Sequence, residues 1–357
     1  MKVKAFLKRK NIEISAKRYG IDALGAMAQG LFCSLLIGTI IRTVGQQLSI
    51  QFLTDIGAYA SAVSGPAMAV AIGFALKADP MVLFSLAAVG WAANAEGGAG
   101  GPLAVYIIAI IAAECGKLVS KETKIDILVT PGVTILVGVA LAKLIAPPIG
   151  IAANAFGNLI DTATNLQPFW MGIAVSVLVG IALTLPISSA AICSVLTMTG
   201  IAGGAAVAGC CAQMVGFAVM SFRENRWGGL VSQGLGTSML QMPNILRNPK
   251  IWIPAILTSA ITGPIATCVF KLQMNGAPIN SGMGTCGLCG PIGVWTGWVA
   301  PGQEALAKGA SAIAPTAMDW LGLLLICFVL PAVLCWAFGL VCRRIGWIKE
   351  GDLALAK

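Results

Sequence analysis

The sequence contains no histidine, and only 10% of its 357 residues are charged. The missing imidazole excludes His-dependent metal sites, Ser-His-Asp triads and phosphohistidine intermediates within this chain. The phosphate-binding pattern Gly-x-x-x-x-Gly-Lys-Ser/Thr is also missing, so nothing supports ATP-driven transport by this chain alone. We therefore predict no catalytic residue, no metal site and no cofactor of its own, and leave open whether the protein takes part in an enzymatic reaction.

The scarcity of charge indicates a membrane protein. Hydrophobic residues make up 57% of the chain and its mean hydropathy is +0.88, whereas soluble domains carry about 25% charged residues. Runs without any charge extend over 56–76, 162–222 and 320–342. Each run reaches the roughly 20 residues that a helical span requires, and the middle run is long enough for more than one. The sequence predicts an all-α polytopic membrane protein with about eight to ten transmembrane helices.

The basic residues gather in four short clusters between the hydrophobic runs. The clusters are Lys2 to Arg18, Lys117 to Lys124, Arg223 to Lys250, and Arg343 to Lys349. Clusters of this kind mark cytoplasmic loops, so we expect both termini on the cytoplasmic side of the membrane. We therefore attribute the net charge of +9 to basic loops that set the membrane topology and face the lipid bilayer. We expect no nucleic-acid partner.

The clusters also divide the chain. We expect a basic, amphipathic, cytoplasmic N-terminus at 1–22, a single transmembrane domain at 23–342 and a cytoplasmic tail at 343–357. The transmembrane domain has a first part at about 23–116, a middle part at 127–222 and a last part at 251–342. The segment 227–248, between the middle and last parts, reads as interfacial or cytoplasmic.

Two segments have the composition of re-entrant or broken helices. One is 262–293, which is rich in glycine and proline and has one charge, Lys271. The other has two short apolar pieces, 81–93 and 102–113, on either side of the polar turn NAEGGAGG. Irregular backbone at bilayer depth survives only where protein or a water-filled cavity satisfies its polar groups, which points to a binding site. We also expect an interruption at APPIG, 146–150, and a division of the long apolar run near Pro186.

An internal repeat is a further hypothesis. SGPAMAVAIGFAL is followed by Lys77 and Pro80, and TGPIATCVF is followed by Lys271 and Pro278; both continue into glycine-rich turns, 97–103 and 287–293. Paired, interrupted segments in two halves of a chain are typical of a transporter's binding site. Chance recurrence of Gly-Pro pairs, in a chain with 43 glycines and 17 prolines, is the alternative. The predicted hairpin residues are Gly65, Pro66, Gly97, Gly98, Gly263, Pro264, Gly284, Gly287, Gly290 and Pro291.

Five polar residues in these two segments are candidates for substrate binding: Asn94, Glu96, Asn275, Asn280 and Thr285. A carboxylate at membrane depth is costly and is by default a functional hypothesis, so Glu96 is the most informative of them. The amides and the hydroxyl offer the donors and acceptors that a neutral polyol needs. The alternative roles are a solvated helix end for Glu96 and capping of broken helices for the others.

Cys286 and Cys289 have the CxxC spacing of redox and metal motifs. No second CxxC pair and no histidine accompanies them, and glycines surround both. We interpret them as small packing residues, with redox or metal chemistry as the alternative.

The strings ITGPI, 261–265, and NSGMGTCGLCGPIG, 280–293, resemble the membrane-embedded IIC component of bacterial sugar phosphotransferase systems. Within that family the chain resembles the branch that includes membrane-bound toxin-regulator homologues. The resemblance implies an all-helical, homodimeric permease with re-entrant hairpins around a midplane sugar site. It also implies a cytoplasmic IIB partner that carries the phosphoryl group.

Two departures from that pattern matter. Glucose-type members have Gly-Ile-Thr-Glu-Pro with its glutamate at the sugar, whereas Gly263 stands before Pro264 here, and this chain lacks their histidine. Glu96 is our candidate to replace the missing acid. The leading hypothesis is a permease that binds and translocates a sugar or polyol, with any phosphorylation supplied by a separate IIB protein. The alternative is a non-transporting membrane sensor that binds a small ligand.

Overall fold

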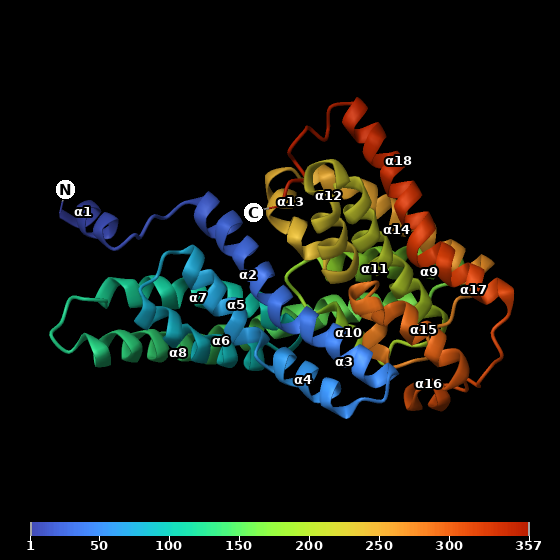
Figure 1. The fold of residues 1–357 in the computed structure, drawn as a ribbon, viewed down its shortest axis with the longest axis horizontal. Coiled ribbons are helices and arrows are strands. Elements are labelled where there is room, and N and C mark those ends of the chain that lie inside the picture. The colour runs from blue at the N-terminus through green and yellow to red at the C-terminus, as the bar shows by residue number, and fades with distance from the viewer. Residues whose placement is uncertain (1, 356–357) are drawn as a thin grey trace. The chain divides into compact units, whose positions relative to one another are not determined.

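The computed structural model describes residues 2–355, and throughout that range the chain is built from helices (Figure 1). No β-strand occurs among these residues; the one extended pairing recorded there is an isolated antiparallel bridge between Gly200 and Met274. The chain forms two compact units, Met1–Ala153 and Asn154–Lys357. The all-α fold predicted from the sequence is confirmed.

Six helical stretches of the described chain are long and apolar enough to cross a membrane. They are Arg18–Gln47, Pro80–Val119, Asp126–Thr164, Gly200–Met220, Pro249–Val269 and Ala317–Arg344. A seventh exists if α4 (Gln51–Ala62) and α5 (Ser64–Ala75), which meet at 48°, cross as one bent span. This count is lower than the expected eight to ten, because it takes the folded stretch Pro80–Val119 as one span and leaves out the shorter apolar helix α9, Pro168–Thr184.

The first unit begins with α1, Lys2–Arg9, and continues with a long helical stretch. That stretch consists of η1 (Arg18–Ala23), α2 (Leu24–Leu31), η2 (Phe32–Leu36) and α3 (Ile37–Gln47). α2 packs against α5, and α3 packs against α4.

A helical hairpin follows in the first unit. α6 (Pro80–Gly97) and α7 (Gly101–Val119) are joined by a single 3-10 turn, η3 (Gly98–Gly100), and pack against each other. Gly98 has a φ of +50°, which glycine adopts at little cost because it lacks a Cβ. The turn NAEGGAGG, residues 94–101, therefore reverses the chain, and the broken segment predicted around it is a helical hairpin.

Residues of the first two basic clusters meet within the first unit. Lys10, after α1, pairs with Glu122 at 2.5 Å and also donates to the Ser120 carbonyl oxygen. The nearly buried Lys117 ammonium donates to the carbonyl oxygens of Asn11 and Leu76 at 2.8 and 3.0 Å. Within this unit the first two basic clusters thus share one end, which supports the prediction that they face the same side of a membrane.

The same end holds an exposed ion pair. Lys121 donates to Asp79 at 2.6 Å, and Ser120 donates to the other oxygen of that carboxylate at 2.9 Å. The hydrogen bond from Lys121, followed by that from Ser120, lowers the pKa of the Asp79 carboxyl. The pair joins the α5–α6 connection to the loop after α7.

The interruption predicted at APPIG is wrong. α8 runs without a break from Asp126 to Thr164, with Pro131, Pro147 and Pro148 inside it. Prolines are tolerated within membrane helices because neighbouring groups and local adjustments satisfy the freed backbone carbonyls. Proline content alone is therefore a weak signal for a break in this chain.

The second unit is organised around α11, Gly200–Met220. α9, α14 (Ile253–Pro264) and α18 (Leu330–Arg344) all pack against it, as the crowded right-hand part of Figure 1 shows. α11 is rich in glycine and alanine, and almost all of its side chains are buried. Small residues let membrane helices approach closely, which explains why this helix occupies the centre.

Shorter elements complete the second unit. They are α10 (Ser189–Val195), α12 (Phe222–Val231), η4 (Ser232–Gly236), η5 (Ser238–Gln241), α13 (Met242–Arg247), η6 (Pro249–Trp252), η7 (Ile265–Val269), η8 (Pro278–Gly282), η9 (Cys286–Leu288), α15 (Cys289–Val299), α16 (Gln303–Ala307), α17 (Ala317–Leu324) and η10 (Leu325–Val329). The third and fourth basic clusters meet within this unit, where Arg343 pairs with Glu224 at 2.7 Å and Lys250 lies over the Trp347 ring at 5.8 Å.

Candidate functional site

A long non-helical interruption follows α14 in the second unit. α14 continues as the π-helical turn η7, Ile265–Val269, and Lys271 just after it has a φ of +47°. The chain is then extended, and Met274 exchanges two backbone hydrogen bonds of 3.0 Å with Gly200. Two short 3-10 turns lead from there to α15. The break predicted within 262–293 is present.

A second interruption packs against the first. α9 ends at Thr184, and the chain passes Pro186 into the short helix α10, whose N-terminus is capped by Ser188 at 3.1 Å. The Ser189 hydroxyl donates to the Gly282 carbonyl at 2.7 Å. The Ser281 hydroxyl donates to the Met198 carbonyl at 2.7 Å. Two irregular segments far apart in sequence thus satisfy each other's backbone groups, which is the condition for irregular backbone inside a membrane protein.

The two segments of the proposed repeat begin alike and then differ. The helix before each ends on a left-handed lysine, with φ of +55° at Lys77 and +47° at Lys271. After Lys77 the chain enters the 18-residue helix α6 within a few residues, whereas after Lys271 it stays extended until η8. The common features are limited to the helix ends, and the internal repeat stays a hypothesis.

Three predicted site residues lie in the second unit. Asn275 is almost fully buried, and its amide donates to the Gln273 side chain at 3.0 Å. The Thr285 hydroxyl is fully buried and donates to the Gly234 carbonyl at 2.5 Å. Asn280 is half-buried beside Gly293, and no described residue hydrogen-bonds its side-chain amide. Of the three, Asn280 keeps its hydrogen-bonding groups available for a ligand.

The other two predicted site residues lie in the first unit, near the end of α6. Asn94 is half-buried and packs against Gly65 and Gly101. Glu96 forms an ion pair with Lys143 of α8, and its side chain is 32% exposed. The carboxylate is therefore paired with a cation rather than isolated, which lowers the cost of placing it in a membrane protein.

The predicted glycines and prolines fall at turns and close contacts. Gly263 of α14 lies against Gly172 of α9, so closely that an added Cβ would overlap the Gly172 carbonyl. Gly65 is in similar contact with Gly90 of α6. Pro66, Pro264 and Pro291 lie within helices, Gly97 and Gly98 lie at the α6–α7 turn, and Gly284, Gly287 and Gly290 surround the turn before α15. Their assignment to substrate-binding hairpins remains a prediction.

A buried polar network next to the interruptions was missed by the sequence reasoning. Gln213 of α11 is fully buried, and its Oε1 accepts from the Trp252 indole N–H at 2.8 Å and from the Thr184 hydroxyl at 3.3 Å. Thr184 also shares a 2.8 Å hydrogen bond with Ser238. Gln213 is the one large polar side chain in α11. That isolation within an apolar helix was the available signal, because a buried polar group needs partners.

Two other features of the second unit are a pair of buried cysteines and a cavity. Cys286 and Cys289 are both buried, and no group of three or more potential metal ligands occurs in the described part of the chain. A cavity of about 260 Å³ lies between α11, α12 and α18, with Trp336, Arg223 and Arg343 in its lining. None of the predicted site residues lines this cavity.

Helices of spanning length, interrupted by irregular segments that carry neutral hydrogen-bonding groups, define a multi-pass membrane protein of the transporter type. The chain belongs to the EIIC family of the phosphotransferase system, because the family model "Phosphotransferase system, EIIC" matches residues 21–355. Membership makes it a phosphotransferase-type membrane permease, and the family implies a sugar substrate and a partner IIB component. Neither a curated protein nor a solved structure matches the chain. The narrower resemblance to toxin-regulator homologues stays a prediction.

Proposed function

We propose that the protein binds a sugar or polyol at its interrupted helices and carries it across the cytoplasmic membrane of a bacterium, with any phosphorylation supplied by a separate IIB protein. The proposal includes a homodimer with both termini in the cytoplasm. It assigns substrate binding to the five polar residues named above, with Asn280 as the best supported.

The half-buried, unpaired amide of Asn280 carries this proposal. It lies in η8, where the two interruptions of the second unit pack together. A carboxamide offers both donors and acceptors, so it matches the hydroxyl groups of a neutral sugar or polyol. The neighbouring polar contacts of Ser189, Ser281 and Thr285 are made to backbone carbonyls, which leaves Asn280 as the adjustable group.

The test is uptake of radiolabelled hexoses, pentoses and polyols by proteoliposomes, with and without phosphorylated IIB protein. We expect saturable uptake of one class of compound, and at least tenfold less with Asn280→Ala, because an unpaired ligand hydroxyl costs about 1–3 kcal/mol. Asn165→Ala, an exposed amide at the end of α8, is the matched control and should transport normally. Equal uptake by both variants would contradict the role of Asn280.

A non-transporting sensor is the second candidate. The ion pair between Glu96 and Lys143, together with glycine at position 263, leaves no unpaired carboxylate at the positions considered for the sugar. A ligand that binds saturably to the purified protein but never crosses the proteoliposome membrane, even with phosphorylated IIB protein, would establish the sensor and reject the permease.

A further inference from the structure

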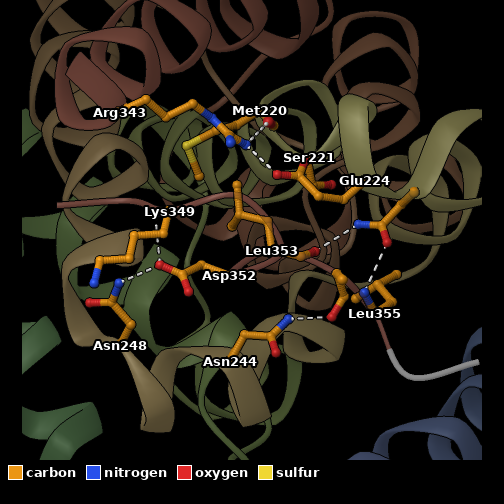
Figure 2. Close-up of polar contacts among 12 residues, drawn as sticks. Met220, Ser221, Glu224, Asn244, Asn248, Arg343, Lys349, Asp352, Leu353 and Leu355 are labelled. Atoms are coloured by element: carbon orange, nitrogen blue, oxygen red, sulfur yellow. Dashed lines mark hydrogen bonds and ion pairs between the residues drawn. The ribbon is translucent and has the colours of Figure 1, made fainter. Parts of the chain in front are cut away.

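The chain turns back after α18 (Figure 1), and the segment that follows makes polar contacts with the segment Phe222–Asn248 of the same unit (Figure 2). The backbone N–H groups of Trp347 and Ile348 donate to the Cys342 carbonyl at 2.9 and 3.3 Å and so terminate α18. Ile348 is 2% exposed and Leu353 is fully buried. The C-terminal segment Lys349–Leu355 is therefore docked through a buried leucine.

Side-chain amides hold the backbone of this segment. Asn225 donates to the Leu353 carbonyl and accepts from the Leu355 N–H, both at 2.8 Å. One carboxamide thus pairs with a C=O and an N–H two residues apart, as a neighbouring β-strand would. Gln241 donates to the same Leu353 carbonyl at 3.0 Å.

Two more asparagines extend the row, as Figure 2 shows. Asn244 donates to the Ala354 carbonyl at 2.8 Å, and Asn248 donates to the Asp352 carboxylate at 2.8 Å. The amides are oriented by one another, since Asn244 donates to Gln241 at 2.8 Å and Gln241 donates to the buried Gln233 at 2.9 Å. These bonds hold the row in place. Of its five hydrogen bonds to the C-terminal segment, four involve backbone atoms and one the Asp352 side chain.

We propose that the row Asn225, Gln241, Asn244 and Asn248 is a peptide-binding site whose ligand is the chain's own C-terminal segment, Lys349–Leu355. Hydrogen bonds to the backbone supply affinity for this turned segment, in which the Asp352 N–H donates to the Lys349 carbonyl and the Ala354 N–H donates to the Gly351 carbonyl. Burial of Leu353 supplies selectivity. Gly346 and Gly351 have φ of +77° and +89°, so glycine turns stand before and within the segment. Docking orders the segment Phe222–Asn248, and release of the peptide uncovers the amide row.

Hydrogen–deuterium exchange on the full-length protein in detergent tests the docking. Leu353→Asp places a charge in the buried position, and Ala354→Asp places the same charge on the exposed neighbour. We expect exchange to become at least tenfold faster over both 349–355 and 222–248 in Leu353→Asp, and to stay at the wild-type rate in Ala354→Asp. Unchanged exchange in Leu353→Asp, or equal effects of the two variants, would overturn the proposal.

Peptide binding in trans tests the site itself. A protein ending at Ile348 should bind a labelled peptide with the sequence of 349–355 saturably, and the full-length protein at least tenfold more weakly, because its site is occupied. The same peptide with aspartate in place of Leu353 should not bind. A truncated protein that folds but does not bind the wild-type peptide overturns the proposal. If truncation prevents folding, the exchange measurement on the full-length variants tests the proposal instead.

Discussion

Replacing Gln213 by methionine tests whether the buried network of the second unit stabilises the fold. Methionine preserves the length and flexibility of the side chain, so the change removes the amide with little loss of packing. The Trp252 indole N–H loses its acceptor at 2.8 Å. Thr184 keeps its hydrogen bond to Ser238 at 2.8 Å, and Ser259 keeps one to the Ala255 carbonyl at 3.0 Å. Only the indole is left without a partner.

The expected cost follows from that one orphaned group. A buried donor without an acceptor costs about 1–3 kcal/mol, and hydrogen bonds within membrane proteins contribute about 0.6 kcal/mol on average, with a maximum near 1.7. Trp252 is only half-buried, which favours the lower part of this range. We expect Gln213→Met to lower the free energy of unfolding by about 1–2 kcal/mol.

The assay is unfolding by SDS in mixed micelles, followed by far-ultraviolet circular dichroism so that tryptophan replacement does not alter the signal. A double-mutant cycle with Trp252→Phe isolates the pair, and we expect a coupling energy of about 1 kcal/mol. The double variant should therefore be about 1 kcal/mol more stable than the sum of the two single losses predicts. A coupling energy near zero, or a Gln213→Met variant as stable as the wild type, would refute the reasoning.

Two further predictions concern the first unit. Glu96→Gln should reduce ligand binding or transport at least tenfold if the carboxylate binds the substrate. Lys143→Met, which removes only the ion-pair partner of Glu96, should have the smaller effect. Unchanged uptake by Glu96→Gln would remove this residue from the site. Asp79→Asn should destabilise the protein at neutral pH by less than about 1 kcal/mol, because the pair with Lys121 is exposed to solvent. The folded-state pKa of Asp79 is lowered, so its contribution is present above the ordinary carboxyl pKa of about 4 and is lost as the pH falls below it. The free energies of unfolding of the wild type and of Asp79→Asn should accordingly converge at low pH. A difference between the two free energies that does not depend on pH would contradict the ion-pair explanation.

Much of the architecture follows from composition, because a bilayer imposes simple requirements on a chain. Long runs without charge predicted spans, and the structure places a spanning helix at 200–220, within the run 162–222, and another at 317–344, over the run 320–342. The breaks near Pro186 and within 262–293 were also predictable, from a single proline at the first and from many glycines and prolines at the second. APPIG shows the limit of that signal: the same residue types lie inside the continuous helix α8, because neighbouring groups decide whether a proline breaks a membrane helix.

The candidate site could be predicted only in part. The sequence identified Asn275, Asn280 and Thr285 by type and position, but their hydrogen-bonding states differ, and only contacts made in the fold distinguish them. Thr285 is bonded to the carbonyl of Gly234, which is 51 positions away. The hydrogen-bonding role of Gln213 was not predicted, because its partners lie on other helices. The periodicity of a single helix does not indicate which partners a polar side chain will meet.

The sequence by itself determined that this is a helical membrane protein and identified several of the places where its helices are interrupted, because hydrophobicity, charge and the backbone limits of glycine and proline are local properties. The tertiary structure alone decided which polar groups are satisfied. It pairs Glu96 with Lys143, joins Gly200 to Met274, and seats the C-terminal segment on Asn225 and Gln241. Each of these pairs brings together groups that are distant in sequence, and a hydrogen bond or ion pair requires that its two members meet within about 3 Å.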